Sequence, residues 1–359
     1  MSTANLDAYD LSQVNLNGLV RESVMDTIFD ISRIPLPFSD RAGTGTHSNQ
    51  YFEWTMDLLN PPVIDGQLID GQVVTSEANV TKVGRRVGNQ SELRGKRIEV
   101  STRANDVNTI GFSNALAYQI TQRQQELRRD VDSTCLSNNA SIKGTDAVAG
   151  QTAGLAAWLT ALDVDGNATA SAVKNTIRGA GGVDGGWDVT PGNGLVAAAT
   201  PGTPVALTDS AIRDVQQACY EAGGSPDTLM TTPAVKRRIS EFQFTDTARI
   251  ASMVNDSPSG SAPQRKAQGS VDLLLNDFGA LTLVPNRLQP AFDTDNDIAF
   301  ILDFSYLEIS YLHSYNVIPL AKTAMSENRF MFVDWGLCVK NWQSCGAIYD
   351  IDPAAPMTA

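Results

Sequence analysis

The chain has 359 residues, of which 42% are hydrophobic and 19% are charged, so it can form a folded core and intrinsic disorder is excluded. Its formal net charge is -13, whereas a sequence-specific nucleic-acid binder is expected to be basic. No run of about 18 apolar residues, as a membrane span requires, and no apolar leader occurs, so we expect a soluble protein without membrane contact.

Residues 1–46 are predicted to form an N-terminal arm with one short amphipathic helix. Val20, Val24, Ile28 and Ile31 recur at helical spacing, and prolines shortly after them end the helix. In an arm of this kind, Val24 and Ile28 would contact a neighbouring subunit. An ordinary helix in the core of the chain is the alternative.

Residues 47–103 are predicted to form an extended loop, a long and thin β-hairpin. Proline and glycine turn signals follow its first part, and residues 97–101 alternate in the manner of a strand. The stretch from Lys82 to Arg103 carries seven basic residues and two acidic ones. The basic residues, which we predict to contact a neighbouring subunit, are Lys82, Arg85, Arg86, Arg94, Lys96, Arg97 and Arg103.

An isolated two-stranded ribbon of this kind is marginally stable in water. Ordering about 20 residues costs roughly 20 to 40 kcal/mol of backbone entropy. At about 25 cal/mol per Å², burial of on the order of 800 to 1,600 Å² of apolar area would offset that cost, which is comparable to a standard protein interface. An acidic face of a neighbouring subunit would complement the basic hairpin. Folding back onto its own domain is the alternative, and composition does not decide between them.

The segment from Phe112 to Asn138 contains neither glycine nor proline, which permits a helix of about 40 Å. Its charged residues lie away from a single apolar stripe, so one face is predicted to be buried and the other solvated. The stripe consists of Phe112, Leu116, Ile120, Leu127, Val131 and Cys135.

The rest of the chain reads as an α/β pattern interrupted by one insertion. Residues 163–206 are rich in Gly, Ala, Thr and Asp, and are predicted to be an inserted segment on the surface. Thr208 is predicted to cap a helix that ends at Gly223, and Pro233 is predicted to open a second helix. Strands are predicted at residues 229–231, 280–284, 298–304, 307–312 and 329–339.

Motifs for catalysis and for metal or cofactor binding do not stand out. The two histidines, His47 and His313, lie far apart in the sequence, and the four cysteines form no CxxC pair, as is typical of a reducing cytoplasm. Asp163 and Asp165 imitate the start of a calcium loop, but the glycine and glutamate that such a loop needs are missing. We therefore predict no catalytic, cofactor-binding or metal-binding residues and no enzyme activity. Carboxylate pairs formed by folding stay invisible in a sequence, so an acidic hydrolase is an alternative.

The order of these elements, an arm, a basic hairpin, a long helix and then an α/β unit with late strands, resembles a tailed-phage major capsid protein of the Hong Kong 97-type fold. That fold is α+β. The motifs that match this family in order are Asn89–Leu93, Glu99–Ser101, Gly111, Glu126–Asp130, Gly154–Leu155 with Trp158, Tyr220–Asp227, Asp277–Gly279, Pro285–Arg287 and Pro319–Lys322.

The resemblance implies a division of the chain into parts of the capsid subunit. Residues 1–46 would be the N-terminal arm and 47–103 the extended loop. Residues 104–149 and 300–359 would form a peripheral domain with a spine helix. Residues 150–299 would form an axial domain that carries the insertion at 163–206.

The resemblance also implies a structural function. The chain would assemble with itself as hexamers and pentamers into an icosahedral shell around double-stranded DNA, without sequence-specific DNA binding and without a membrane. Scaffolding, portal and decoration proteins would be its partners. It would belong to the virion capsid and assemble in the cytoplasm of a host bacterium. An encapsulin-like compartment, an acidic hydrolase and a monomeric binding module are the alternatives.

Overall fold

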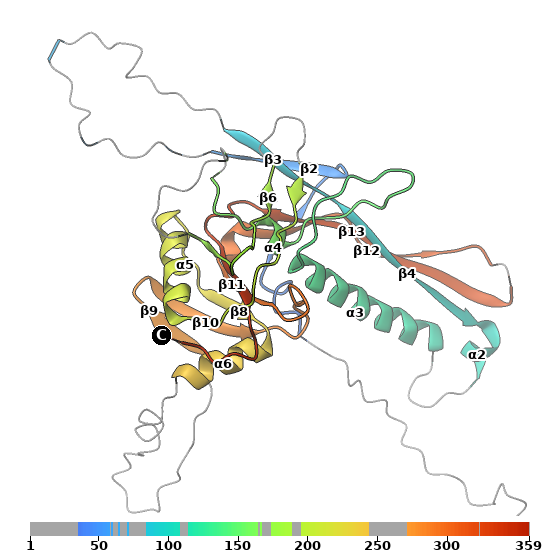
Figure 1. The fold of residues 1–359 in the computed structure, drawn as a ribbon. Coiled ribbons are helices and arrows are strands. Elements are labelled where there is room, and N and C mark those ends of the chain that lie inside the picture. The colour runs from blue at the N-terminus through green and yellow to red at the C-terminus, as the bar shows by residue number, and fades with distance from the viewer. Residues whose placement is uncertain are drawn as a thin grey trace, which may run out of the picture.

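The computed structural model describes residues 35–57, 84–107, 114–163, 174–188, 195–243, 271–322 and 324–358, together with positions 59, 64, 70, 71 and 166. The described residues build two main sheets and two small two-stranded sheets, one of which is the ribbon described below (Figure 1). The predicted arm helix, with Val24 and Ile28, lies outside the described residues, and so does Lys82.

A four-stranded sheet carries the longest strands of the chain. β12 and β13 form an antiparallel hairpin, β1 lies parallel to β12, and β4 lies antiparallel to β13. The strands follow the order β1 (Gly43–Thr46), β12 (Leu307–Pro319), β13 (Ser326–Val339) and β4 (Glu92–Ser101).

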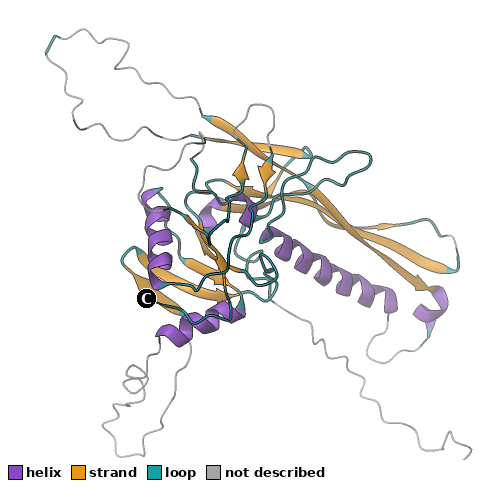
Figure 2. Cartoon of the chain, viewed as in Figure 1, coloured by secondary structure: helices purple, strands orange, loops and turns teal. Residues whose placement is uncertain are grey.

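The long helix α3 (Ala115–Cys135) runs alongside these strands (Figure 2). The Asn114 side chain accepts a hydrogen bond from the Ala117 N–H and so satisfies an orphan donor at the start of the helix. Leu127, Val131 and Cys135 are buried, while Leu116 and Ile120 of the same stripe pack half-buried against the same core. The predicted helix and its single buried face are confirmed; Phe112 lies outside the described residues.

A six-stranded sheet forms the second unit. Leu229, Ile301 and Ile348 pack under helices α5 (Asp209–Glu221) and α6 (Pro233–Gln243) on one face. Neighbouring residues of the same strands point to the other face and join the core that contains α3, so the central strands are buried on both sides. The strands follow the order β5 (Thr176–Ile177), β14 (Gly346–Ile351), β11 (Asp297–Leu302), β8 (Thr228–Thr231), β10 (Gly279–Pro285) and β9 (Leu273–Asn276).

Local sequence signals placed several of these elements correctly. Thr208 caps α5 by accepting from the Ala211 N–H at 3.1 Å, and α6 begins at Pro233. The predicted strands at 229–231, 280–284, 298–304, 307–312 and 329–339 correspond to β8, β10, β11, β12 and β13. β14 was missed as a separate element; it pairs with β11 inside the six-stranded sheet, while the division into axial and peripheral domains stays a prediction.

The predicted hairpin over 47–103 is divided between two places. β2 (Tyr51–Met56) and β3 (Arg85–Gln90) form an antiparallel ribbon that lies across the body of the chain, with one face packed on the core (Figure 1). β4 leaves this ribbon and pairs with β13, and the short helix α2 (Thr102–Asp106) follows it. β13 is therefore the ladder partner of β4, in place of a strand of the predicted hairpin.

The described residues of the predicted insertion, 174–188 and 195–206, contact the body through a few buried anchors, while most of their side chains are partly or fully exposed. β5 joins the edge of the six-stranded sheet, and β6 (Gly186–Trp187) pairs with β7 (Val196–Ala197). The Arg178 side chain is 8% exposed, and its guanidinium carbon lies 3.5 Å from the centre of the Tyr349 ring. The fully buried Asp350 carboxylate accepts from the N–H groups of glycines 179 and 202, which ties two parts of the insertion to β14.

Candidate subunit interface

The basic residues predicted to contact a neighbour lie on three different elements. Arg85 and Arg86 belong to the ribbon strand β3, and Arg103 belongs to α2. Arg94, Lys96 and Arg97 lie on β4. Because β4 belongs to the four-stranded sheet, the structure separates its basic residues from those of the ribbon.

The face of β4 that points toward α3 uses its basic residues within the same chain. The Lys96 ammonium lies 2.8 Å from Asp130 and 3.2 Å from Glu126, both on α3. Arg94 pairs with the buried Glu92, and its Nη1 lies 3.5 Å from the Asp130 carbonyl oxygen. These two basic residues therefore hold β4 against the helix. The sequence had predicted that they contact a neighbouring subunit.

The carboxyl group of Glu126 is the centre of this charged cluster. It accepts from Arg123 at 2.6 Å and from Lys96 at 3.2 Å. The hydrogen bond from Arg123 lowers the pKa of Glu126 below its usual value; burial opposes this shift, and Lys96 contributes further to the lowering. The cluster is thus assembled to keep this carboxylate ionised at the helix surface.

The opposite face of β4 and the outer side of the ribbon remain open to solvent. The Arg97 side chain is 57% exposed and pairs with Glu99 on the same strand. Arg86 is 71% exposed and pairs with Glu53 across the ribbon. Exposed ion pairs of this kind contribute little to folding, so both arginines can contact another chain without a large cost to the subunit.

The root of the ribbon is held by aromatic packing that sequence reasoning did not identify. On β2, Phe52 stacks on His47 with ring centres 4.4 Å apart, and Trp54 lies 5.5 Å from Trp158. Trp158 belongs to the buried helix α4 (Leu155–Trp158) and also contacts the tryptophans at 187 and 342. The alternation of Tyr51–Met56 could have indicated one packed face, because alternate strand residues share a side.

Asn89 of β3 anchors the other strand of the ribbon. Its side chain is fully buried, donates to the Leu337 carbonyl at 2.8 Å and accepts from the Ala153 N–H at 3.0 Å. It also donates to Thr152 Oγ1 at 3.1 Å. A buried amide with satisfied hydrogen bonds fixes one geometry, so the ribbon leaves the body in a defined direction.

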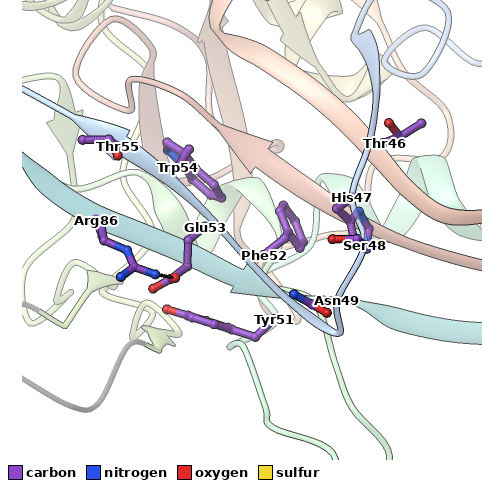
Figure 3. A pocket seen from close by; sticks show the side chains of 10 residues that line it. All are labelled: Thr46, His47, Ser48, Asn49, Tyr51, Phe52, Glu53, Trp54, Thr55 and Arg86. Carbon is purple, nitrogen blue, oxygen red and sulfur yellow. Dashed lines mark hydrogen bonds and ion pairs between the residues drawn. The ribbon is translucent and has the colours of Figure 1, made fainter.

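A depression of about 380 Å³ lies where the ribbon leaves the body (Figure 3). Tyr51, Glu53 and Arg86 lie on one side of β2, and Phe52 and Trp54 point to its other side. The outer group is polar and charged. This surface is suited to contact with a polar segment, and it lacks the enclosed shape of a small-molecule site.

The described part of the chain offers little for catalysis or metal binding. It contains no group of three or more His, Cys, Asp or Glu side chains placed to hold a metal ion. All four cysteines are buried and unbonded, and burial raises the pKa of Cys338 and of Cys345 to about 12, so neither thiol ionises near neutral pH. Among the described helices, none combines the length and apolar character needed to cross a bilayer.

This combination of a long helix beside a four-stranded sheet, a six-stranded α/β unit and a two-stranded ribbon is the Hong Kong 97-type capsid fold. The capsid of a native GTA particle has a similar structure, with a TM-score of 0.56 at 12% identity, over 95% of this chain and 98% of that one. The holo-SrpI encapsulin complex from Synechococcus elongatus PCC 7942 is similar as well, with a TM-score of 0.51 at 8% identity, over 99% of both chains.

The model of the SU10 major capsid protein family matches residues 4–352, and the chain therefore belongs to that family of structural capsid proteins. A similar curated protein is the major capsid protein of Escherichia phage Phieco32, which is 27% identical over 223 residues. That match spans 55% of this chain and 59% of the length of the relative. The resemblance to a tailed-phage major capsid protein is confirmed.

Proposed function

We propose that the chain assembles as hexamers and pentamers into the icosahedral shell that encloses the double-stranded DNA genome of a tailed phage. The observation that carries this proposal is the β2–β3 ribbon, whose inner face is held on the body by Asn89 and Trp54 while its outer face, with Arg86 71% exposed, is open to solvent (Figure 1). The open outer face of such a ribbon is suited to burial against a neighbouring subunit. Shell formation is a binding function, and the chain performs it without catalysis.

Within this function, Arg86 and Arg97 are the basic residues best placed to contact a neighbour. Their side chains are 71% and 57% exposed, whereas Lys96 is occupied by two carboxylates of its own chain. An acidic surface on the adjacent subunit would complement them, in keeping with a chain of net charge -13. Arg85 of the ribbon and Arg103 of α2 are further candidates for contact with a neighbouring subunit.

Further partners follow from the same proposal. Scaffolding and portal proteins would guide assembly in the cytoplasm of the host, and decoration proteins would bind the finished shell. DNA would be packaged without sequence-specific contacts, because an acidic inner wall does not trap phosphates. The encapsulin compartment is the second candidate, since the SrpI shell has a similar fold.

The content of purified shells tests this proposal against the encapsulin alternative. Particles from the native source are treated with nuclease, opened, and assayed for protected DNA and for enclosed protein. Long double-stranded DNA of one uniform length is expected. Shells that enclose one enzyme and no DNA would support the encapsulin reading, and a chain that stays monomeric with its scaffolding protein would contradict both.

A further inference from the structure

Residues 36–42 join the beginning of the described chain to three separate elements. The Phe38 side chain is fully buried, with its ring 5.8 Å from that of Phe304. Asp40 lies 3.6 Å from Arg128 of α3, and Arg41 donates to Thr228 of β8 at 3.2 Å. The chain then continues directly into β1 and the four-stranded sheet. The segment therefore contacts the spine helix and both sheets within a few residues.

The carboxylate of Asp132 lies at the centre of this junction and is fully buried on α3. Its Oδ1 accepts from both the backbone N–H and the hydroxyl of Ser39, each at 2.8 Å. Its Oδ2 accepts from the side-chain amide of Asn286 at 3.2 Å. One side chain thus connects segment 36–42, the spine helix and the loop after β10.

Both carboxylate oxygens of Asp132 face hydrogen-bond donors, so both must act as acceptors. Asn286 cannot turn its amide around without a loss, because its Oδ1 already accepts from the Leu288 N–H at 2.8 Å. An asparagine at position 132 could still accept from Ser39, but it would then direct a second N–H₂ group at the amide donor of Asn286. Only a carboxylate satisfies both partners in a buried site.

We propose that Asp132 is a positioning residue for assembly: it fixes where the N-terminal arm leaves the subunit relative to the spine helix and the six-stranded sheet. Segment 36–42 leads through β1 into the ribbon strand β2, so a shift at Asp132 would be passed to the ribbon as well as to the arm. The inference rests on the proposed shell function, in which the arm and the ribbon contact neighbouring subunits.

The test compares Asp132→Asn with Asp350→Asn in the full chain. Asp350 is the matched control, because it is also fully buried and accepts three hydrogen bonds from N–H donors, but it lies on β14, away from segment 36–42. The first readout is the rate of trypsin cleavage after Arg41 in unassembled subunits. Cleavage there requires opening of the turn in which the Ala42 N–H donates to the Phe38 carbonyl.

Asp132→Asn is expected to accelerate cleavage after Arg41 about tenfold and to lower shell yield about tenfold, at a temperature where both variants are folded. Asp350→Asn is expected to leave the Arg41 cleavage rate unchanged. If Asp132→Asn does not fold, Ser39→Ala replaces it, with an expected acceleration of about threefold. Equal acceleration in both aspartate variants, or a wild-type rate in Asp132→Asn, would overturn the proposal. Because cleavage is measured on unassembled subunits, it tests the positioning role of Asp132 even if the wild-type chain forms no shells.

Discussion

Lys96 illustrates how one basic side chain is used inside the subunit. Its ammonium lies between Glu126 and Asp130 of α3, so Lys96→Glu would bring three carboxylates together. We expect this variant to lose about 1 to 2 kcal/mol of unfolding free energy, because two half-exposed attractions become repulsions. Urea denaturation measures the loss. Adding Glu126→Lys to Lys96→Glu should restore part of it, and a Lys96→Glu variant as stable as the wild type would show that the cluster does not hold β4.

The carboxyl group of Glu126 makes the free energy of unfolding of the subunit depend on pH. The pKa of its carboxyl is lower in the folded chain than its usual 4.5, chiefly because of the hydrogen bond from Arg123. The stabilisation is therefore fully present above about pH 4.5 and is lost as the pH falls through the folded pKa. Urea midpoints of the wild type and Glu126→Gln should differ near neutral pH and converge under acid conditions. A difference that stays constant with pH would contradict this role.

At the scale of elements, the spine helix depends on its one buried stripe. Leu127 is 1% exposed on α3, and Leu127→Ala removes most of its side chain from the core. A loss of about 2 to 5 kcal/mol of unfolding free energy is expected. Gln124→Ala, on the exposed face of the same helix, is the control and should change stability by less than about 0.5 kcal/mol. Similar losses in both variants would mean that the stripe does not carry the helix.

The elements that could be predicted from sequence are those specified by local signals. The stripe ending at Cys135, the cap at Thr208 and the proline at 233 placed α3, α5 and α6 close to their observed bounds. The division of the hairpin could not be predicted, because β4 pairs with β13, whose residues follow far later in the chain. Strand pairing over such a separation leaves no local pattern, and the alternation of β4 fits either partner.

The candidate interface stays a prediction, and the structure divides its basic residues into an exposed group and a group with partners in the same chain. Arg86 and Arg97 are exposed, as an interface residue must be, while Arg94 and Lys96 have partners in their own chain. Sequence alone could not separate these two pairs, since the direction of each side chain depends on which strand β4 joins. The buried Asn89 likewise gave no signal, because its hydrogen-bond partners come from distant segments.

At the scale of the whole molecule, the exposed arginines provide a test of how the subunits meet. The double variant Arg86→Glu with Arg97→Glu should leave the subunit folded and lower shell yield on the order of tenfold, because like charges across an interface are costly. Thermal unfolding and particle counts by electron microscopy measure the two effects. Lys143→Glu, an exposed lysine outside the ribbon and β4, is the control for charge. Normal shell yield in the double variant would exclude these arginines from the contact.

The packing of the insertion also belongs to this scale. A composition rich in glycine and alanine indicated a surface segment, yet Trp187 stacks on Trp158 and Asp350 binds the backbone of the insertion. The composition of a segment indicates how much apolar area it can bury. It gives no information about backbone hydrogen bonds to a buried carboxylate elsewhere in the chain. The described part of the insertion is therefore tied to the folded body of this capsid protein.

The most direct test of the account is a cryo-electron microscopy reconstruction of assembled particles at a resolution that shows side chains. The central claim is that this chain is a shell subunit whose β2–β3 ribbon is completed by a neighbour. The reconstruction should show a closed icosahedral shell in which the ribbon rests on an adjacent subunit, with Arg86 and Arg97 within reach of its carboxylates. A shell in which the ribbon contacts only its own subunit would contradict the claim.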